Sequence, residues 1–344
     1  MTIEFKKEGF TYKYLDPAQD FNERAIYSEV RTDPLTKEAC NVLVTPFRYR
    51  VPVKPDFEAM IQKSLTVTCP FCPQSIEKVT PKFTPDFFAE GRMRLGEACI
   101  FPNAGPYTPY TGIVVLSDKH FIDLPDLSEE TVANGLLAAQ TYLRRVAEYD
   151  PAAKYYSLTW HYLPASGGSQ LHPHMQALAG SSPTKYHSQV LEASQGYWEN
   201  NSSNFWADLI ATEKELGERH IAAVGDIAWL SCFVGRGLFP NVMAIFQEKD
   251  SLLNLSEADI ADFVKGLKNV LAYLNDQNIP SFNLSIYSGI VGEDYFWAYA
   301  KIIPRFTFPP VDASDMTAWQ IMYDQPYTII PPEDACKELR EYFA

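Results

Sequence analysis

One order of predicted elements occurs twice in this sequence, and it limits the folds open to the chain. Residues 97–180 have the pattern strand, strand, helix, strand, strand, and the same order returns over 226–304. Both predicted helices begin after a serine N-cap, in LSEE at 127–130 and in LSEA at 255–258. The recurrence of order, length and helix start indicates an internal duplication. We therefore expect an α+β fold of two similar halves, with antiparallel sheets covered by helices on one face.

The repeat divides the chain into three predicted segments. An N-terminal half covers 1–185, a helical bridging insert covers 186–225, and a C-terminal half covers 226–344. The length of 344 residues allows two modest domains or one large domain built from repeated halves. The insert is polar, so we expect its histidines, His187 and His220, to be exposed to solvent.

The charge and hydropathy of the chain exclude several kinds of partner. Twenty-nine basic and 43 acidic residues give a net charge of −14, which argues against nucleic acid as a partner. No apolar run approaches the roughly 20 residues that span a bilayer, so no membrane partner is expected. The N-terminal segment lacks the apolar core of a secretory signal, which predicts a cytoplasmic protein without disulfides.

The segment GGSQLHPHMQ, residues 167–176, contains two of the six histidines. On a strand, His172, His174 and Gln176 would share a face, because side chains alternate along a strand. An imidazole can be a metal ligand, a base or a nucleophile, and a carboxamide can donate to a phosphoryl oxygen without adding negative charge. The corresponding strand of the second half, YFWAYAKIIP, contains no histidine. The chemistry is therefore expected in the first half.

The glycines before these histidines suggest a binding loop. Gly167, Gly168 and Ser169 can place backbone N–H groups and a hydroxyl around phosphate oxygens, although such a sequence is more often only a turn. Upstream, Cys69 and Cys72 form a CxxC motif, which in a reducing compartment indicates a metal knuckle or a redox pair. The proline-rich setting favours metal, and zinc would need two more ligands. The alternative is a pair of buried thiols with no ion.

Several of these motifs together resemble a known family. HPHMQ preceded by GGSQ is similar to the H-x-H-x-Q signature of the galactose-1-phosphate uridylyltransferase branch of the histidine-triad superfamily, and to its diadenosine tetraphosphate phosphorylases. The motifs RTDPLT at 31–36, CPFC at 69–72, IFPN at 100–103 and VVLSDKH at 114–120 agree with that branch. The motifs cover residues 30–180, and the second half agrees in architecture only.

The resemblance implies a role for each matching residue. It implies a zinc ion held by Cys69, Cys72, His120 and His172, a closed set of ligands that would fix the strand. It implies that His174 is a nucleophile that attacks the α-phosphorus of a nucleotide, with Gln176 in contact with the phosphoryl oxygens. The expected substrate contacts are Asn103 to the nucleoside, Arg48 to the diphosphate, and Gly167, Gly168, Ser169 and Gln170 around the phosphates.

The chain also departs from the family. Tyr299, Ala300 and Lys301 stand where some members carry a second H-x-H, so their second metal site is expected to be absent. The hexose-phosphate segment near the C-terminus has no clear counterpart. The main expectation is a nucleotidyltransferase that acts on a nucleotide sugar, and the family also suggests a homodimer. The alternatives are a dinucleoside polyphosphate phosphorylase or hydrolase, and a nucleotide-binding protein without turnover.

Overall fold

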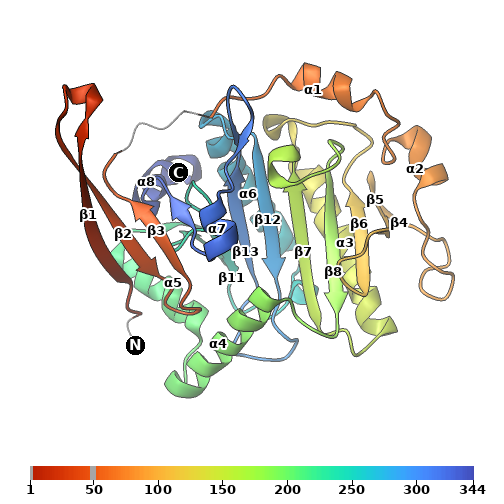
Figure 1. Cartoon of the computed structure of the whole chain (residues 1–344). Coiled ribbons are helices and arrows are strands. Elements are labelled where there is room, and N and C mark those ends of the chain that lie inside the picture. The colour runs from red at the N-terminus through yellow and green to blue at the C-terminus, as the bar shows by residue number, and fades with distance from the viewer. Residues whose placement is uncertain (1–2, 47–51) are drawn as a thin grey trace.

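One ten-stranded antiparallel sheet forms the centre of the molecule (Figure 1). The computed structural model describes residues 3–46 and 52–344. The strand order in this sheet is β4-β5-β6-β8-β7-β12-β13-β11-β10-β9. The first repeat supplies β4 (Met93–Leu95), β5 (Ala98–Pro102), β6 (Tyr110–Val115), β7 (Tyr155–Tyr162) and β8 (His174–Gly180). The second repeat supplies β9 (His220–Val224), β10 (Ile227–Ser231), β11 (Val242–Phe246), β12 (Ser281–Tyr287) and β13 (Tyr299–Arg305).

The two halves join where β7 pairs with β12. The pairing is antiparallel and runs from Tyr162 opposite Phe282 to Ser157 opposite Tyr287. The equivalent inner strands of the two repeats are therefore neighbours, and one sheet passes through both halves. The expected α+β fold of duplicated halves is confirmed. The division at residues 185 and 225 remains a proposal.

Two long helices cover one face of the sheet. They are α3 (Glu129–Tyr149) and α6 (Glu257–Asp276), and they pack against each other and against both halves. The expected serine caps are present, because Ser128 accepts from the backbone of Thr131 and Ser256 accepts from the backbone of Asp259. The predicted helices on one face of the sheet are thus confirmed.

The opposite face of the second half is covered by the insert. Its helices, α4 (Lys185–Asn201) and α5 (Phe205–Leu216), pack Val190, Trp206 and Leu209 onto a face that includes Tyr299 (Figure 1). The prediction that His187 is solvated is wrong. Its side chain is 3% exposed and its Nε2 lies 2.6 Å from the Ser288 carbonyl, because this side of α4 faces the sheet.

On the first half, the same face carries the segment around the CxxC motif. Ile76 of α2 (Pro73–Val79) and Phe71 pack over strand residues at the outer edge, and α1 (Phe57–Ser64) precedes them. The 3₁₀ turn Pro164–Ser166 separates β7 from the segment that leads into β8. This face therefore presents β8 beside the CxxC segment.

A second sheet joins the two ends of the chain. It consists of β1 (Lys6–Asp16), β2 (Asn22–Thr32), β3 (Ala39–Leu43) and β16 (Tyr327–Thr328), and in Figure 1 its first two strands lie apart from the main sheet. The remaining elements are β14 (Thr307–Phe308), β15 (Ala313–Ser314), α7 (Ala318–Tyr323), α8 (Pro332–Phe343) and three more 3₁₀ turns, Pro17–Gln19, Leu124–Asp126 and Leu252–Asn254. None of the helices in the described part of the chain is long and apolar enough to cross a membrane.

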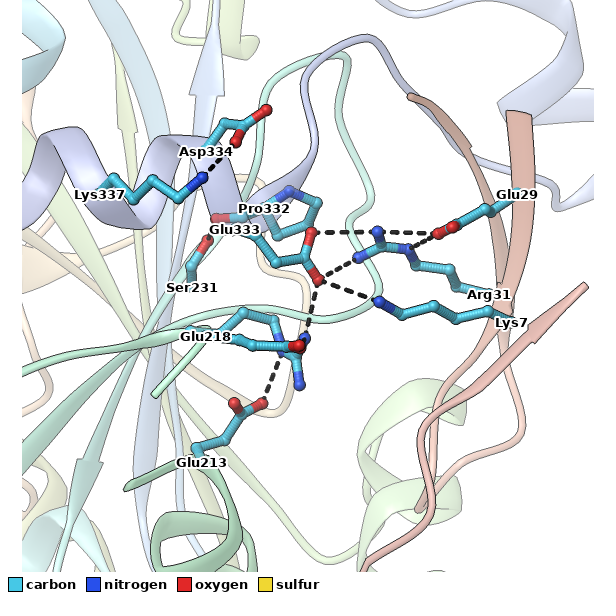
Figure 2. Close-up of polar contacts among 11 residues, drawn as sticks. Lys7, Glu29, Arg31, Glu213, Glu218, Ser231, Pro332, Glu333, Asp334 and Lys337 are labelled. Carbon is cyan, nitrogen blue, oxygen red and sulfur yellow. Dashed lines mark hydrogen bonds and ion pairs between the residues drawn. The ribbon is translucent and has the colours of Figure 1, made fainter. Parts of the chain in front are cut away.

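An ion network fixes the second sheet to α8 (Figure 2). The carboxylate of Glu333 accepts from Arg31 at 2.8 and 3.0 Å and from Arg219 at 2.8 Å, and Lys7 lies 3.6 Å away. Arg31 and Arg219 have almost no exposed surface, and Glu333 is the carboxylate that they share, beside Glu29 on Arg31 and Glu213 and Glu218 on Arg219.

Candidate active site

His174 is the first residue of β8, and its ring is held in one orientation. Its Nδ1 lies 2.8 Å from the carbonyl oxygen of His172, so the Nδ1–H donates and Nε2 carries the free lone pair. Burial lowers the pKa of His174, whose side chain is 8% exposed. The ring is therefore neutral at neutral pH, which is the form of an imidazole that attacks phosphorus.

Gln176 and Asn103 lie together on the same face as His174. The Nδ2 of Asn103 donates to Oε1 of Gln176 at 3.2 Å, while Oδ1 of Asn103 accepts from the backbone of Gly105 at 2.9 Å. These bonds orient the Gln176 amide so that its Nε2 remains free to donate. The structure thus brings together three residues that the sequence predicted.

Asn103 also lies on the wall of a pocket of about 410 Å³ at the outer edge of the sheet. The aromatic rings of this pocket are those of Phe83, Phe87, Tyr110, Tyr142 and Tyr149. Pockets of this size, with mostly apolar walls and a few polar groups such as the Asn103 amide, are typical of sites that bind small molecules.

The loop before His172 begins with the two glycines of the expected phosphate cradle. The Gly167 N–H donates to Pro164 O at 2.9 Å, and the Gly168 N–H donates to Leu163 O at 3.3 Å. Both N–H groups make hydrogen bonds inside the turn in this conformation. Their predicted contact with a phosphate stays a proposal. Gly167 has a φ of +88°, which glycine adopts most readily.

Ser169 and Gln170, which follow the turn, line a pocket of about 570 Å³. Its wall also includes Lys63, Ser64 and His120, whereas His174 and Gln176 are not among its lining residues. The two predicted loop residues therefore face a cavity beside the nucleophile rather than the nucleophile itself.

Sequence reasoning missed a contribution from the second half. Asn283 of β12 donates from Nδ2 to Ser166 O at 2.8 Å, and Arg305 donates from Nη1 to Oδ1 of Asn283 at 2.8 Å. Arg305 is itself held by Asp315 at 2.8 to 3.1 Å. This series of hydrogen bonds supports the 3₁₀ turn Pro164–Ser166, which precedes the glycine loop. Apolar and polar residues alternate in SFNLSIY, which places Asn283 on the polar side of its strand. This alternation could have indicated that Asn283 lies on the same face of the sheet as the candidate site.

His161 is a second residue that the sequence reading did not assign. In β7 it lies opposite Asn283 and follows Trp160, which lies opposite Met175 of β8, so it is close to His174. Its charge contributes to the lowered pKa of His174, after burial. Burial, followed by the charge of Arg305, lowers the pKa of His161. Arg48 lies outside the described residues.

The four predicted metal ligands lie together. One ligand atom from each of Cys69, Cys72, His120 and His172 falls within 4.8 Å of the others. Cys72 Sγ lies 3.3 Å from His120 Nδ1 and 3.6 Å from His172 Nδ1, and Cys69 Sγ lies 3.8 Å from His172 Nδ1. Tetrahedral zinc would separate sulfur and nitrogen ligands by about 3.6 Å. The cluster therefore could hold a metal ion.

The hydrogen bonds behind the two imidazoles fit metal binding. His172 Nε2 lies 2.7 Å from Ser117 O, and His120 Nε2 lies 2.8 Å from Ser64 Oγ, whose hydroxyl proton is given to Ile61 O. Each Nε2 must therefore donate its proton, which leaves each Nδ1 lone pair directed at the cysteines. Burial and the adjacent Cys69 raise the pKa of Cys72 to about 11 when no ion is bound.

The comparisons with known proteins agree on the fold. No protein-family profile matches the chain. A protein of Archaeoglobus fulgidus, named only as an uncharacterized protein, is 26% identical in an alignment of 344 positions that covers 99% of each chain. A GalT-like protein of Arabidopsis thaliana superposes with a TM-score of 0.69 and 18% identity, covering 91% of this chain and 98% of the other. The chain has the uridylyltransferase fold.

Two further structures show the same fold with named activities. An ADP-glucose phosphorylase from Arabidopsis thaliana, with ADP-glucose bound, gives a TM-score of 0.69 at 18% identity over 91% of this chain and 99% of that one. A uridylyltransferase gives 0.65 at 19% identity over 91% and 98%. The expected likeness to the galactose-1-phosphate uridylyltransferase branch is thus confirmed for the fold. The uridylyltransferase fold accounts for the ten-stranded sheet that passes through both halves.

Proposed function

We propose that this protein transfers a nucleoside monophosphate through a covalent intermediate on His174. The observation that carries the proposal is the buried, neutral imidazole whose Nδ1–H is bound to His172 O and whose Nε2 is free. Beside it, Gln176 is oriented by Asn103 to donate toward a phosphoryl oxygen. Nucleophile and orienting donor thus lie on one face of β8.

The reaction would proceed in two balanced steps. The Nε2 lone pair attacks the α-phosphorus, a P–N bond forms, and the P–O bond to the leaving phosphate breaks with its electron pair on that oxygen. An oxygen of the acceptor phosphate then attacks the same phosphorus and the P–N bond breaks. Gln176 would bind the phosphoryl oxygens in both transition states without adding negative charge.

The donor is proposed to be a nucleoside diphosphate sugar. Asn103, which is hydrogen-bonded to Gln176, would contact the nucleoside, because an amide can recognise the edge of a base. Ser169 and Gln170, on the neighbouring cavity, would contact the remainder of the donor. Arg48 stays a proposed diphosphate contact, and Gly167 and Gly168 stay proposed phosphate contacts that also shape the turn.

The metal is proposed to be zinc, with a structural role. Two thiolates and two imidazoles form a closed tetrahedral set, which leaves no position for a substrate. Cys69, Cys72, His120 and His172 would then fix the segment that ends in the His172 carbonyl. Because that carbonyl orients the His174 ring, the zinc ligands would affect catalysis only by keeping the nucleophile in position.

A second candidate is phosphorolysis, in which inorganic phosphate is the acceptor. The sequence lacks a counterpart of the hexose-phosphate segment, and one structure of this fold is an ADP-glucose phosphorylase. A dinucleoside polyphosphate would be an alternative donor for the same two steps. The chemistry at His174 is the same in each case, so the donor and the acceptor separate the candidates.

The test is intact-protein mass spectrometry after brief incubation with UDP-glucose, UDP-galactose, ADP-glucose or diadenosine tetraphosphate. We expect one nucleoside monophosphate to add to the native protein and none to add to His174→Ala. His220→Ala, which alters a histidine outside the site, should behave as the native protein. An adduct on His174→Ala, or binding without any adduct, would refute the covalent mechanism. Adding phosphate or a hexose phosphate to the isolated adduct would identify the acceptor, because the true acceptor removes the added mass.

A further inference from the structure

The second half contains a small cavity at the position that corresponds to the active site of the first half. Counted from the first residue of each strand, Tyr299 of β13 corresponds to His174 of β8, and Lys301 corresponds to Gln176. In both strands the residue between them, Met175 or Ala300, packs in the core on the helix side. Tyr299 and Lys301 therefore share the face that carries the nucleophile in the first half.

The insert closes this face and forms the cavity. The walls come from β13 and its neighbouring strands, from α4 and α5, and from residues 33–36. The volume is about 50 Å³, which holds roughly four water molecules or an anion of four or five heavy atoms.

Three hydrogen-bond donors lie in this cavity. Lys301 Nζ donates to the hydroxyl of Tyr186 at 2.6 Å, and within the described part of the chain it forms no ion pair. The indole N–H of Trp206, a residue 2% exposed, has no hydrogen-bond partner, and the hydroxyl of fully buried Tyr299 makes no hydrogen bond of normal geometry. A buried donor without an acceptor, and a buried ammonium without a counter-anion, are costly.

The two acidic groups on the cavity wall, Asp33 and Glu213, form no ion pair with Lys301 within the described residues. Asp33 Oδ1 accepts from the backbone of Leu35 at 2.9 Å and of Thr36 at 2.8 Å. Glu213 Oε1 accepts from Arg219 at 2.9 Å, and its Oε2 has no hydrogen-bond partner. Neither carboxylate forms an ion pair with Lys301, so the ammonium keeps unused donor capacity.

A wider pocket adjoins the cavity on its outer side. It has a volume of about 280 Å³ and shares Asp33, Pro34 and Phe205 with the inner cavity. Lys6 and Lys37 lie on its wall together with Glu4. The two lysines place positive charge on the outer side of the cavity, where it can attract an anion.

We propose that this cavity is a binding site for a small oxyanion, a phosphate or a carboxylate, held by Lys301 and the Trp206 indole N–H. The apolar rings around these groups strengthen a charge-assisted hydrogen bond by excluding water. The site is separate from His174 and does not depend on the proposed transfer reaction.

The proposal is tested by thermal unfolding in a zwitterionic buffer titrated with sodium phosphate or sodium acetate. A His174→Ala, Gln176→Ala background removes anion binding at the candidate active site. In that background we expect Tm to rise and then level off as one of the two salts is added, because the site becomes saturated. The anion of that salt is then the one that the cavity binds. Adding Lys301→Met should weaken binding about tenfold or more, because a charge-assisted hydrogen bond is lost. Lys214→Met, an exposed lysine of α5, is the matched control.

Trp206→Phe provides a second variant that keeps the ring but removes the N–H. It should also weaken binding, which keeps the test decisive if Lys301→Met does not fold. The proposal is overturned if neither salt changes Tm more than sodium chloride does. It is also overturned if the salt raises Tm equally with and without the Lys301→Met and Trp206→Phe substitutions. Lys301→Met should still form the nucleotidyl adduct, so failure here and failure of the proposed transfer are distinguishable.

Discussion

At the scale of single residues, one backbone carbonyl decides how His174 can react. The sequence identified His174 and Gln176 as candidates, because two imidazoles and an amide at alternate positions are typical of phosphoryl chemistry. It gave no information on the tautomer. The contact of 2.8 Å between Nδ1 and His172 O fixes the proton on Nδ1, and the sequence does not show which backbone groups lie against the ring.

The Gln176 amide is predicted to be required for its neutral charge as well as its position. Gln176→Glu keeps the shape but adds a negative charge beside the phosphoryl oxygens. We expect the rate of adduct formation to fall by about 10² or more, as for loss of an oxyanion donor. Single-turnover kinetics with the best donor would measure it, and an unchanged rate would remove Gln176 from the mechanism.

The metal ligands are predicted to act as one set. Cys69→Ser should lower the zinc content to well below half an equivalent, because a closed site loses a thiolate. Cys99→Ser, which alters a buried cysteine outside the cluster, should retain zinc. Elemental analysis of both purified variants is the measurement, and equal zinc in both would contradict the assignment.

Zinc binding should also release protons. The pKa of Cys72, about 11 without an ion, means that its thiol is protonated at neutral pH and must lose that proton to bind metal. Affinity should therefore fall as pH falls. Titrations of metal-free protein in two buffers of different ionisation enthalpy would count the protons, and a proton-neutral reaction would refute the thiolate ligand set.

At the scale of elements, the turn after β7 positions the candidate loop. A side chain at Gly168 would place Cβ 2.8 Å from His161 O and 3.0 Å from Leu163 O, both backbone atoms. The sequence predicted this glycine as a phosphate contact, which stays a proposal, and the structure shows that it permits close chain approach. The close approach was not predicted, because backbone contacts inside a turn are decided by its three-dimensional path.

Gly168→Ala is therefore predicted to destabilise the fold by about 1–3 kcal/mol through overpacking. Gly196→Ala is the control, because its Cβ would meet nothing within 4 Å and it lies inside α4. There alanine should stabilise by about 0.5–1 kcal/mol. Chemical denaturation measures the free energy of unfolding of both variants. If Gly168→Ala were no less stable than the native protein, the turn would be able to accommodate a Cβ.

Asn283 is predicted to support catalysis from the second half. Asn283→Ala removes the hydrogen bond to Ser166 O, so the loop loses an anchor and adduct formation should slow by about tenfold. Donor affinity should change less than the rate. Single-turnover rates over a range of donor concentrations separate these effects, with the exposed Asn254→Ala as control. A purely structural role would lower Tm without altering the rate of the folded protein.

At the scale of the whole molecule, charges join the two ends of the chain. Burial alone would raise the pKa of Glu333, but hydrogen bonds and charge from Arg31, with a further contribution from Arg219, hold it at about 2. Because the folded pKa lies below the unfolded value, this contribution is fully present above about pH 4.5. It is lost as pH falls from there toward 2.

Glu333→Gln is predicted to cost on the order of 3 kcal/mol at pH 7, because Arg31 and Arg219 lose their shared anion. The stability gap between the variant and the native protein should close as pH falls from about 4.5 to 2. Urea denaturation at several pH values measures it. A gap that is constant with pH would mean that Glu333 contributes packing rather than charge.

The sequence by itself determined the elements and the candidate chemistry. Strand alternation, helix periodicity and serine caps are local, so the duplicated α+β fold, the shared face of His174 and Gln176 and the CxxC pair could be predicted from short stretches. The nucleophile role of His174 and the addition of His120 and His172 to the cysteines came from the resemblance to the uridylyltransferase branch. Tertiary structure decided what depends on distant segments. The pairing of β7 with β12, the support of the loop by Asn283, the burial of His187 and the cavity at Lys301 all require contacts between residues far apart in the chain, and no local pattern encodes such contacts.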